Sequence, residues 1–311
     1  MNPHKHTHGH THGVIDPSIL ATEKGIWAVK WSFVALMSTT TIQALVVYFS
    51  GSVALLGDTV HNLGDAFTAI PIGLAFIFGQ KKPNKCFTYG YGRLEDVAGI
   101  FVVLAILISG LFAGYVSIER FFNPQKVEYL GAIVFASIIG FIGNEAVAVF
   151  RIKVGKEMGS AALIADGYHA RIDGLVSLGV LLSVFGVWLG YPLADPIIGL
   201  IMTLMIFKIV WESSVTVFTR MLDGVEPGLV DKIQDEAIQV KGVLGVNEIR
   251  VRWIGHKLHA EVNITVDKVI SVEKGHQIAL QVKHELIHHL QFLTKVIIQV
   301  DPANASGEKF H

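Results

Sequence analysis

The chain has 311 residues, but only one of them is cysteine, Cys86, and only 16% are charged. A single cysteine excludes a disulfide within the chain and any metal site built on a CxxC motif. Residues 1–13 contain no apolar stretch, so we expect no cleavable signal peptide. The formal net charge is −1 at pH 7, and no basic tail or patch points to nucleic acid as a partner.

Hydrophobic residues are abundant instead. They make up 51% of the chain and occur in long blocks, which is typical of a polytopic membrane protein. A helix needs roughly 20 apolar residues to cross the hydrocarbon core of a bilayer. Six segments are long enough, and we predict a transmembrane helix in each: 27–49, 52–79, 94–117, 130–152, 160–189 and 194–212.

Lys and Arg residues are distributed unevenly between the connections of these segments. They follow the second, fourth and sixth segments, at Lys81, Lys82, Lys85, Arg93, Arg151, Lys153, Lys156, Lys208 and Arg220. The opposite connections carry few, and acidic residues offset those. Because positive loops stay in the cytoplasm, we expect both termini to be cytoplasmic.

From about Asp223 the composition becomes that of a soluble domain. The pattern predicts a helix over 226–240, strands over 246–253 and 258–266, a helix over 273–293 and a strand over 295–300. We therefore expect a cytoplasmic α+β, ferredoxin-like domain over 216–303, which regulates through metal and dimerises, after a transmembrane domain over 25–215. A His-rich tail (1–24) and a short tail (304–311) flank them. A domain this small gains stability by pairing with a copy of itself.

One motif occurs twice, once in the second and once in the fifth apolar segment. Asp58-x-x-His61-x-x-x-Asp65 is repeated as Asp166-x-x-His169-x-x-x-Asp173. Each histidine and the aspartate four residues later share one helix face, about 6 Å apart. Ionisable residues are costly in a membrane and usually functional there. Two such helices offer the four ligands of a divalent metal site, although polar packing between helices is an alternative.

The ligand types indicate which ions such a site prefers. Imidazole with carboxylate favours zinc, cobalt or ferrous iron, and cadmium is a related candidate. These metals would be substrates, and we expect no organic cofactor. Metal binds neutral imidazole and ionised carboxylate, so protonation ejects it. We therefore expect metal export in exchange for protons by alternating access.

Asp58 and Asp166 precede the two histidines by three residues on nearly the same helix face. They are candidates for outer-shell groups that orient the imidazoles or for steps on an ion path. Location at a water-filled cavity near the membrane surface is the other interpretation.

These features together resemble the cation diffusion facilitator family of divalent-metal transporters. The resemblance covers six spans, the HxxxD pairs in the second and fifth, and the order of the soluble elements. It also includes Tyr89-Gly-Tyr-Gly-Arg93-Leu-Glu95 and Leu222-Asp223-Gly224. It implies a homodimeric metal–proton antiporter of the zinc type in a bacterial or archaeal inner membrane, not an enzyme, with His61, Asp65, His169 and Asp173 as the transport site.

The resemblance also implies a regulatory metal site in the soluble domain, where His276 and Asp301 match the family pattern. Asn247, Asn263 and Gln299 stand where the family often has histidine, so at most one weakened site is expected. A second loop site found in some members is not expected, because Asn84–Tyr91 lacks its ligands.

Two further histidine patterns suggest metal binding. The tail carries His4, His6, His8, His10 and His12, a composition typical of a disordered, metal-gathering segment or of a tail without a role. His284-Glu285-Leu286-Ile287-His288 satisfies the zinc-protease motif HExxH, for which a solvated helix face is the simpler explanation. The alternatives to a transporter are thus a membrane metallohydrolase that uses residues 284–288 and a metal sensor without transport.

Overall fold

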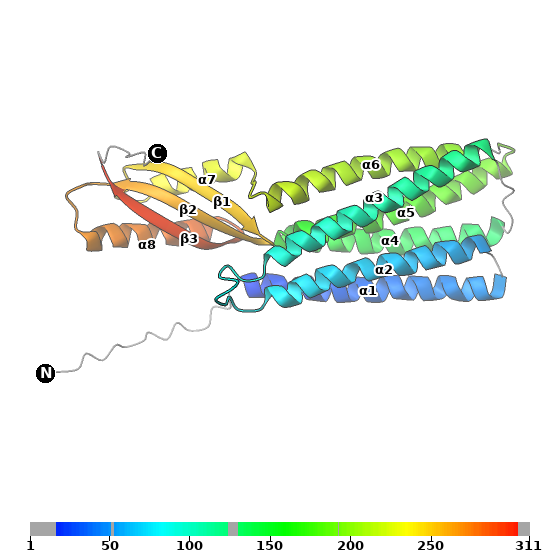
Figure 1. Ribbon diagram of the computed structural model, residues 1–311, viewed down its shortest axis with the longest axis horizontal. Helices are drawn as coiled ribbons and strands as arrows, with labels where there is room; N and C mark the ends of the chain where they lie inside the picture. Colours follow the sequence, from blue (N-terminus) through cyan, green and yellow to red (C-terminus); the bar gives the residue numbers. More distant parts are fainter. Residues whose placement is uncertain (1–16, 51–52, 124–129, 192, 304–311) are drawn as a thin grey trace.

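A computed structural model describes residues 17–50, 53–123, 130–191 and 193–303. Six long helices run through its first part and a small α/β domain follows at one end (Figure 1). The six helices are α1 (Pro17–Ser50), α2 (Val53–Gly79), α3 (Arg93–Phe122), α4 (Leu130–Met158), α5 (Ala161–Trp188) and α6 (Ala194–Met221). Each of them contains most or all of one of the six segments that the sequence predicts.

Four of these helices, α3 to α6, are long and apolar enough within the described residues to cross a membrane by length and composition. In α2 a shorter apolar stretch, Ala69–Gly79, meets the composition alone. The prediction of a polytopic helical membrane domain is confirmed.

Four helices are clearly longer than their predicted spans. α1 begins at Pro17, α3 continues to Phe122, α4 continues to Met158 and α6 continues to Met221. Hydropathy marks only the part that is apolar, whereas the helix continues wherever its backbone hydrogen bonds do. Lys, Arg and Glu propagate a helix well, so the ends extend beyond the apolar segments.

α4 and α5 are adjacent antiparallel helices with unusually close backbones. A Cβ on Gly167 of α5 would lie 2.9 Å from the backbone nitrogen of Ile152 on α4, and one on Gly155 of α4 would lie 3.0 Å from that of Ile164 on α5. Only glycine permits this approach, and it fixes which residues of the two helices face each other.

The C-terminal domain has the predicted order of elements: α7 (Pro227–Ile238), β1 (Gly245–Ile254), β2 (Lys257–Val266), α8 (Val272–His289) and β3 (Leu293–Pro302). β2 is central, antiparallel to β1 and parallel to β3. Alternate residues of β2 are buried together with the inner faces of α7 and α8, so both helices cover one face of the sheet. α8 ends before the predicted residue 293, because Leu290 has extended backbone angles and Phe292 has a φ of 70°.

The domain meets the helix bundle at the beginning of α3 and α5 and at the end of α6. Gly92 contacts Ile254, Gly159 contacts Phe292, and the guanidinium group of Arg220 lies over the ring of Trp253. The other ends of α3, α5 and α6 therefore lie at the far side of the bundle, remote from the C-terminal domain (Figure 1).

Candidate metal-transport site

His169 and Asp173 form the α5 half of the predicted site. Both side chains are buried, with 1% and 5% of the residue surface exposed, although they lie in an apolar helix. The Nδ1 atom of His169 is 4.0 Å from Oδ2 of Asp173, as the i, i+4 spacing predicts. One divalent ion between such a nitrogen and oxygen could be held by both.

The α2 half of the site is described only by its backbone. His61 and Asp65 lie within α2, and the side chains of these two residues and of Asp58 lie outside the described part. α2 contacts α5, and Ala66 and Ala170 belong to the same small buried cluster. Since these residues immediately follow Asp65 and His169, the fold supports the expectation that the two motifs lie at one level of the bundle.

Among the described side chains, no group of three or more histidine, cysteine, aspartate or glutamate residues is arranged to hold a metal. A complete site would need ligands from both helices. The four-ligand site at His61, Asp65, His169 and Asp173 therefore stays a prediction.

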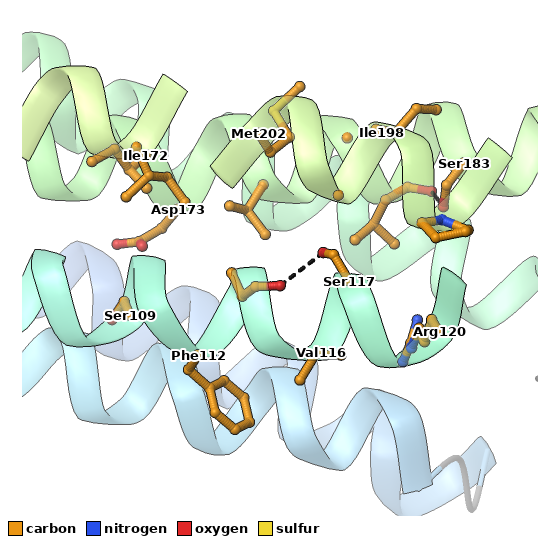
Figure 2. A pocket seen from close by; sticks show the side chains of 17 residues that line it. Ser109, Phe112, Val116, Ser117, Arg120, Ile172, Asp173, Ser183, Ile198 and Met202 are labelled. Atoms are coloured by element: carbon orange, nitrogen blue, oxygen red, sulfur yellow. Dashed lines mark hydrogen bonds between the residues drawn. The ribbon is translucent and has the colours of Figure 1, made fainter. Parts of the chain in front are cut away.

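A cavity of about 370 Å³ extends from Asp173 toward the far side of the bundle. Asp173 lies at one end of the cavity and the exposed Arg120 at the other, between α3, α5 and α6 (Figure 2). Its walls are mainly apolar, with the hydroxyl groups of Ser109, Ser117 and Ser183 among them. The buried carboxylate thus has a path toward the far side.

Asp166, a candidate outer-shell residue, forms an ion pair with Arg151, which the sequence indicated only as one of the positive residues after the fourth segment. Its Oδ2 atom lies 2.8 Å from Nη1 of Arg151 on α4. No contact that is described links Asp166 to the imidazole of His169, so its predicted orienting role is untested.

A second ion pair also joins α4 and α5. Arg171 donates to both carboxylate oxygens of Glu145, at 3.2 and 2.8 Å. Each side chain is about one-third exposed, 33% and 32%. Neither residue contacts a ligand of the predicted site in the described structure.

The predicted regulatory residues lie in different surroundings. His276 lines a surface cavity between α8 and β3. Asp301 instead accepts hydrogen bonds from Asn263 at 2.7 Å and Gln299 at 3.3 Å. The amides that stand in place of family histidines therefore occupy the Asp301 carboxylate, and a metal site with His276 stays a prediction.

The other histidine patterns give no further site. His284 and His288 lie on the exposed face of α8 with ring centroids 4.3 Å apart, but no third ligand accompanies them in the part of the chain that is described. His4, His6, His8, His10 and His12 lie outside the described residues.

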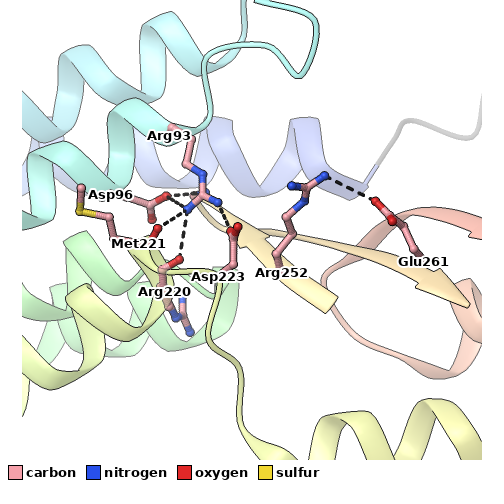
Figure 3. A network of polar contacts seen from close by, with 8 residues as sticks. Arg93, Asp96, Arg220, Met221, Asp223, Arg252 and Glu261 are labelled. Carbon is pink, nitrogen blue, oxygen red and sulfur yellow. Dashed lines mark hydrogen bonds and ion pairs between the residues drawn. The ribbon is translucent and has the colours of Figure 1, made fainter. Parts of the chain in front are cut away.

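Sequence reasoning missed the polar contacts at the junction of the two domains. Arg93 forms ion pairs with Asp223 and Asp96 and donates to the carbonyl groups of Arg220 and Met221 (Figure 3). Close by, the buried His256 lies against Glu95. The charged motif around Arg93 was a signal for this junction, whereas His256 gave none.

Comparison with known proteins covers almost the whole chain. Residues 29–222 match the model of the cation efflux transmembrane domain, and residues 225–303 match that of the cation efflux protein cytoplasmic domain.

Individual relatives agree with these matches. A probable cation efflux system protein of Mycobacterium tuberculosis is 46% identical over 301 residues, 97% of this chain and 90% of that protein. The manganese efflux system protein MneP of Bacillus subtilis is 27% identical, over 91% of this chain and 99% of its own. The cadmium, cobalt and zinc/H(+)-K(+) antiporter of Bacillus subtilis is 26% identical, over 87% of each chain.

Proposed function

We propose that this chain, which belongs to the cation efflux family, exports zinc or a similar divalent transition metal from the cytoplasm in exchange for protons. Its membership makes it a cation efflux transporter of divalent metals and an integral membrane protein, not an enzyme. The metallohydrolase alternative based on residues 284–288 has no support in these relatives. Beyond this family membership we propose which metal is transported, that protons are exchanged for it, and which residues bind it.

The observation that carries the proposal is the buried nitrogen–oxygen pair His169 and Asp173 on α5 together with its repeat in α2. A buried carboxylate in a membrane helix is costly unless a cation accompanies it during function. The cavity that reaches Asp173 supplies a path for such a cation.

The choice of zinc comes from the ligand set. Two imidazoles and two carboxylates suit a borderline ion with tetrahedral preference, whereas an all-oxygen set suits manganese or magnesium. Relatives are named for manganese on the one hand and for cadmium, cobalt and zinc on the other. The ligands of this chain favour the second group.

Proton exchange follows from the same ligands. A proton on an imidazole or a carboxylate removes a metal ligand, so protons entering from outside displace metal outward. We further propose an inner-membrane homodimer with both termini in the cytoplasm, where the C-terminal domains pair.

Metal flux into inverted membrane vesicles tests the proposal. We expect zinc uptake driven by an imposed pH gradient, and we expect Asp65→Ala and Asp173→Ala each to abolish it. Glu212→Ala is a matched control, because this membrane-helix carboxylate is exposed and pairs only with Lys208 on its own helix in the described structure. Uptake that persists in both aspartate variants would refute the site, and binding without flux in the native protein would favour the sensor alternative. Competition between zinc, cobalt, ferrous iron, cadmium and manganese ranks the metals.

A further inference from the structure

The Arg151–Asp166 pair is the most deeply buried ion pair in the part of the chain that is described. Only 1% of the Arg151 side chain and 0% of the Asp166 side chain are exposed. Among the described residues, the Nε and Nη2 atoms of Arg151 have no hydrogen-bond partner. Burial of a guanidinium–carboxylate pair is itself energetically costly, so a structural role alone explains it poorly.

The pair lies on the direct way from the C-terminal domain to the predicted site. Asp166 is nearly one helical turn before His169, on the side of the C-terminal domain. Around it the side chains of Ala161, Ala162, Leu163 and Ala165 are all buried. The cavity at Asp173 opens toward the opposite, far side. In this structure the described cavity therefore connects Asp173 with the far side, and the Arg151–Asp166 pair lies on the other side of the site.

The Arg151–Asp166 pair is not needed to hold α4 against α5. Glycines already bring the two helices into backbone contact, and the Arg171–Glu145 pair joins them with two hydrogen bonds. Replacing a buried ion pair with apolar residues is often neutral or stabilising. Cohesion of the helices thus gives no reason to retain a charge pair in this position.

The chemistry of the pair gives such a reason. A carboxylate is a good ligand for a divalent cation, whereas a guanidinium group is a permanent cation that cannot bind metal. Asp166 can therefore be neutralised by Arg151 or by an entering metal ion, and the two exclude each other. The geometry points to Asp166 as the transient entry ligand for metal coming from the C-terminal-domain side, with Arg151 closing that entrance by taking its place.

This inference rests on the proposed function and deepens it, since it adds an entry step before His169 and Asp173. The inference makes a prediction that a purely structural pair does not make, because substitutions of the two partners should change the apparent affinity for metal in opposite directions. Removal of Arg151 frees the carboxylate for metal. Removal of the Asp166 charge deletes the entry ligand.

The test is zinc uptake into vesicles whose C-terminal domain faces the added metal. We expect Arg151→Met to lower the apparent KM for zinc about tenfold and to lower the maximum rate, because the entrance no longer closes. We expect Asp166→Asn to raise the apparent KM about tenfold, and Asp166→Glu to stay near the native value because it keeps a carboxylate. Tenfold corresponds to about 1.4 kcal/mol.

Arg171→Met and Glu145→Gln are the matched controls, since they break the other ion pair between the same two helices. They should leave the apparent KM within about twofold of the native value. A shift of the same sign in Arg151→Met and Asp166→Asn, or none in either, overturns the inference. If either variant gives no flux, the Kd for zinc is measured by titration of the purified full chain in detergent. We then expect a lower Kd in Arg151→Met and a higher Kd in Asp166→Asn, and shifts of the same sign overturn the inference. Failure of Asp173→Ala to stop transport would instead refute the proposed site, whatever the Arg151 and Asp166 variants show.

Discussion

The imidazole of His256 lies with Nδ1 2.8 Å from Oε2 of Glu95, a residue 161 positions earlier in the chain. Its Nε2 atom lies 3.0 Å from the hydroxyl of Thr22 on α1. A neutral ring with its proton on Nδ1 satisfies both contacts, donating to the carboxylate and accepting from the hydroxyl. One buried side chain from the turn between β1 and β2 thereby connects the C-terminal domain to both α1 and α3.

We expect His256→Ala to loosen this connection. The substitution leaves the Glu95 carboxylate buried without its partner, which costs roughly 1–3 kcal/mol. Hydrogen exchange should therefore become faster in peptides that cover the beginning of α3 and the β1–β2 turn. His289→Ala is the control, because the contact between His289 and Glu236 is at the surface. Unchanged exchange in His256→Ala would show that the two domains do not depend on this contact.

His169→Asp should change which metal is transported. The substitution removes a nitrogen ligand and adds an oxygen ligand on the same helix face, and oxygen-rich sites favour manganese over zinc. We expect zinc uptake to fall by at least about tenfold, while manganese uptake falls less or rises. Competition uptake with both metals in one vesicle preparation measures the ratio. An unaltered zinc-to-manganese ratio would mean that His169 does not bind the transported ion.

Some of this structure depends on local sequence, and that part was predictable. His169 and Asp173 share a helix face because an i, i+4 spacing does so in any helix. The alternation of Leu258, Ala260 and Val262 likewise predicts a strand with one buried face, as observed.

Partners on different elements were not predictable in the same way. Asp166 meets Arg151 because Gly155 and Gly167 let α4 lie closely against α5, and no periodicity encodes that alignment. His256 belongs to a short turn, and only the docking of the domain against α3 brings it to Glu95. Side-chain contacts between distant segments therefore had to come from the structure.

Glu285→Gln should leave metal transport unchanged. The HExxH motif lies on an exposed face of α8, and a zinc protease would need this glutamate as its general base. Since the chain belongs to an efflux family, we expect native uptake in vesicles. We also expect no peptidase activity in the purified protein, with or without the substitution. Peptide cleavage that Glu285→Gln abolishes would revive the hydrolase interpretation.

The stability of the sheet should depend on pH through His259. Across the strands this residue is opposite Arg252 on one side and Lys295 on the other, with Tyr89 lying near all three side chains. Burial first, and then the charges of Lys295 and Arg252, lower the pKa of His259 from 6.5 to about 4. Protonated imidazole is thus disfavoured in the folded domain but not in the unfolded chain.

Between pH 6.5 and about 4 the unfolded chain therefore binds a proton at this position that the folded domain does not bind. Folding stability is at its full value above pH 6.5 and falls as the pH decreases through this window. After allowance for the partial exposure of the ring, we expect a loss on the order of 1 kcal/mol. Hydrogen exchange of β2 and β3 in the full chain at pH 7.5 and 5, corrected for intrinsic rates, measures this loss of stability.

His259→Gln should remove this part of the pH dependence, whereas His284→Gln on the exposed face of α8 should retain it. Equal pH dependence in the native chain and His259→Gln would show that burial and the neighbouring charges do not lower the pKa of His259.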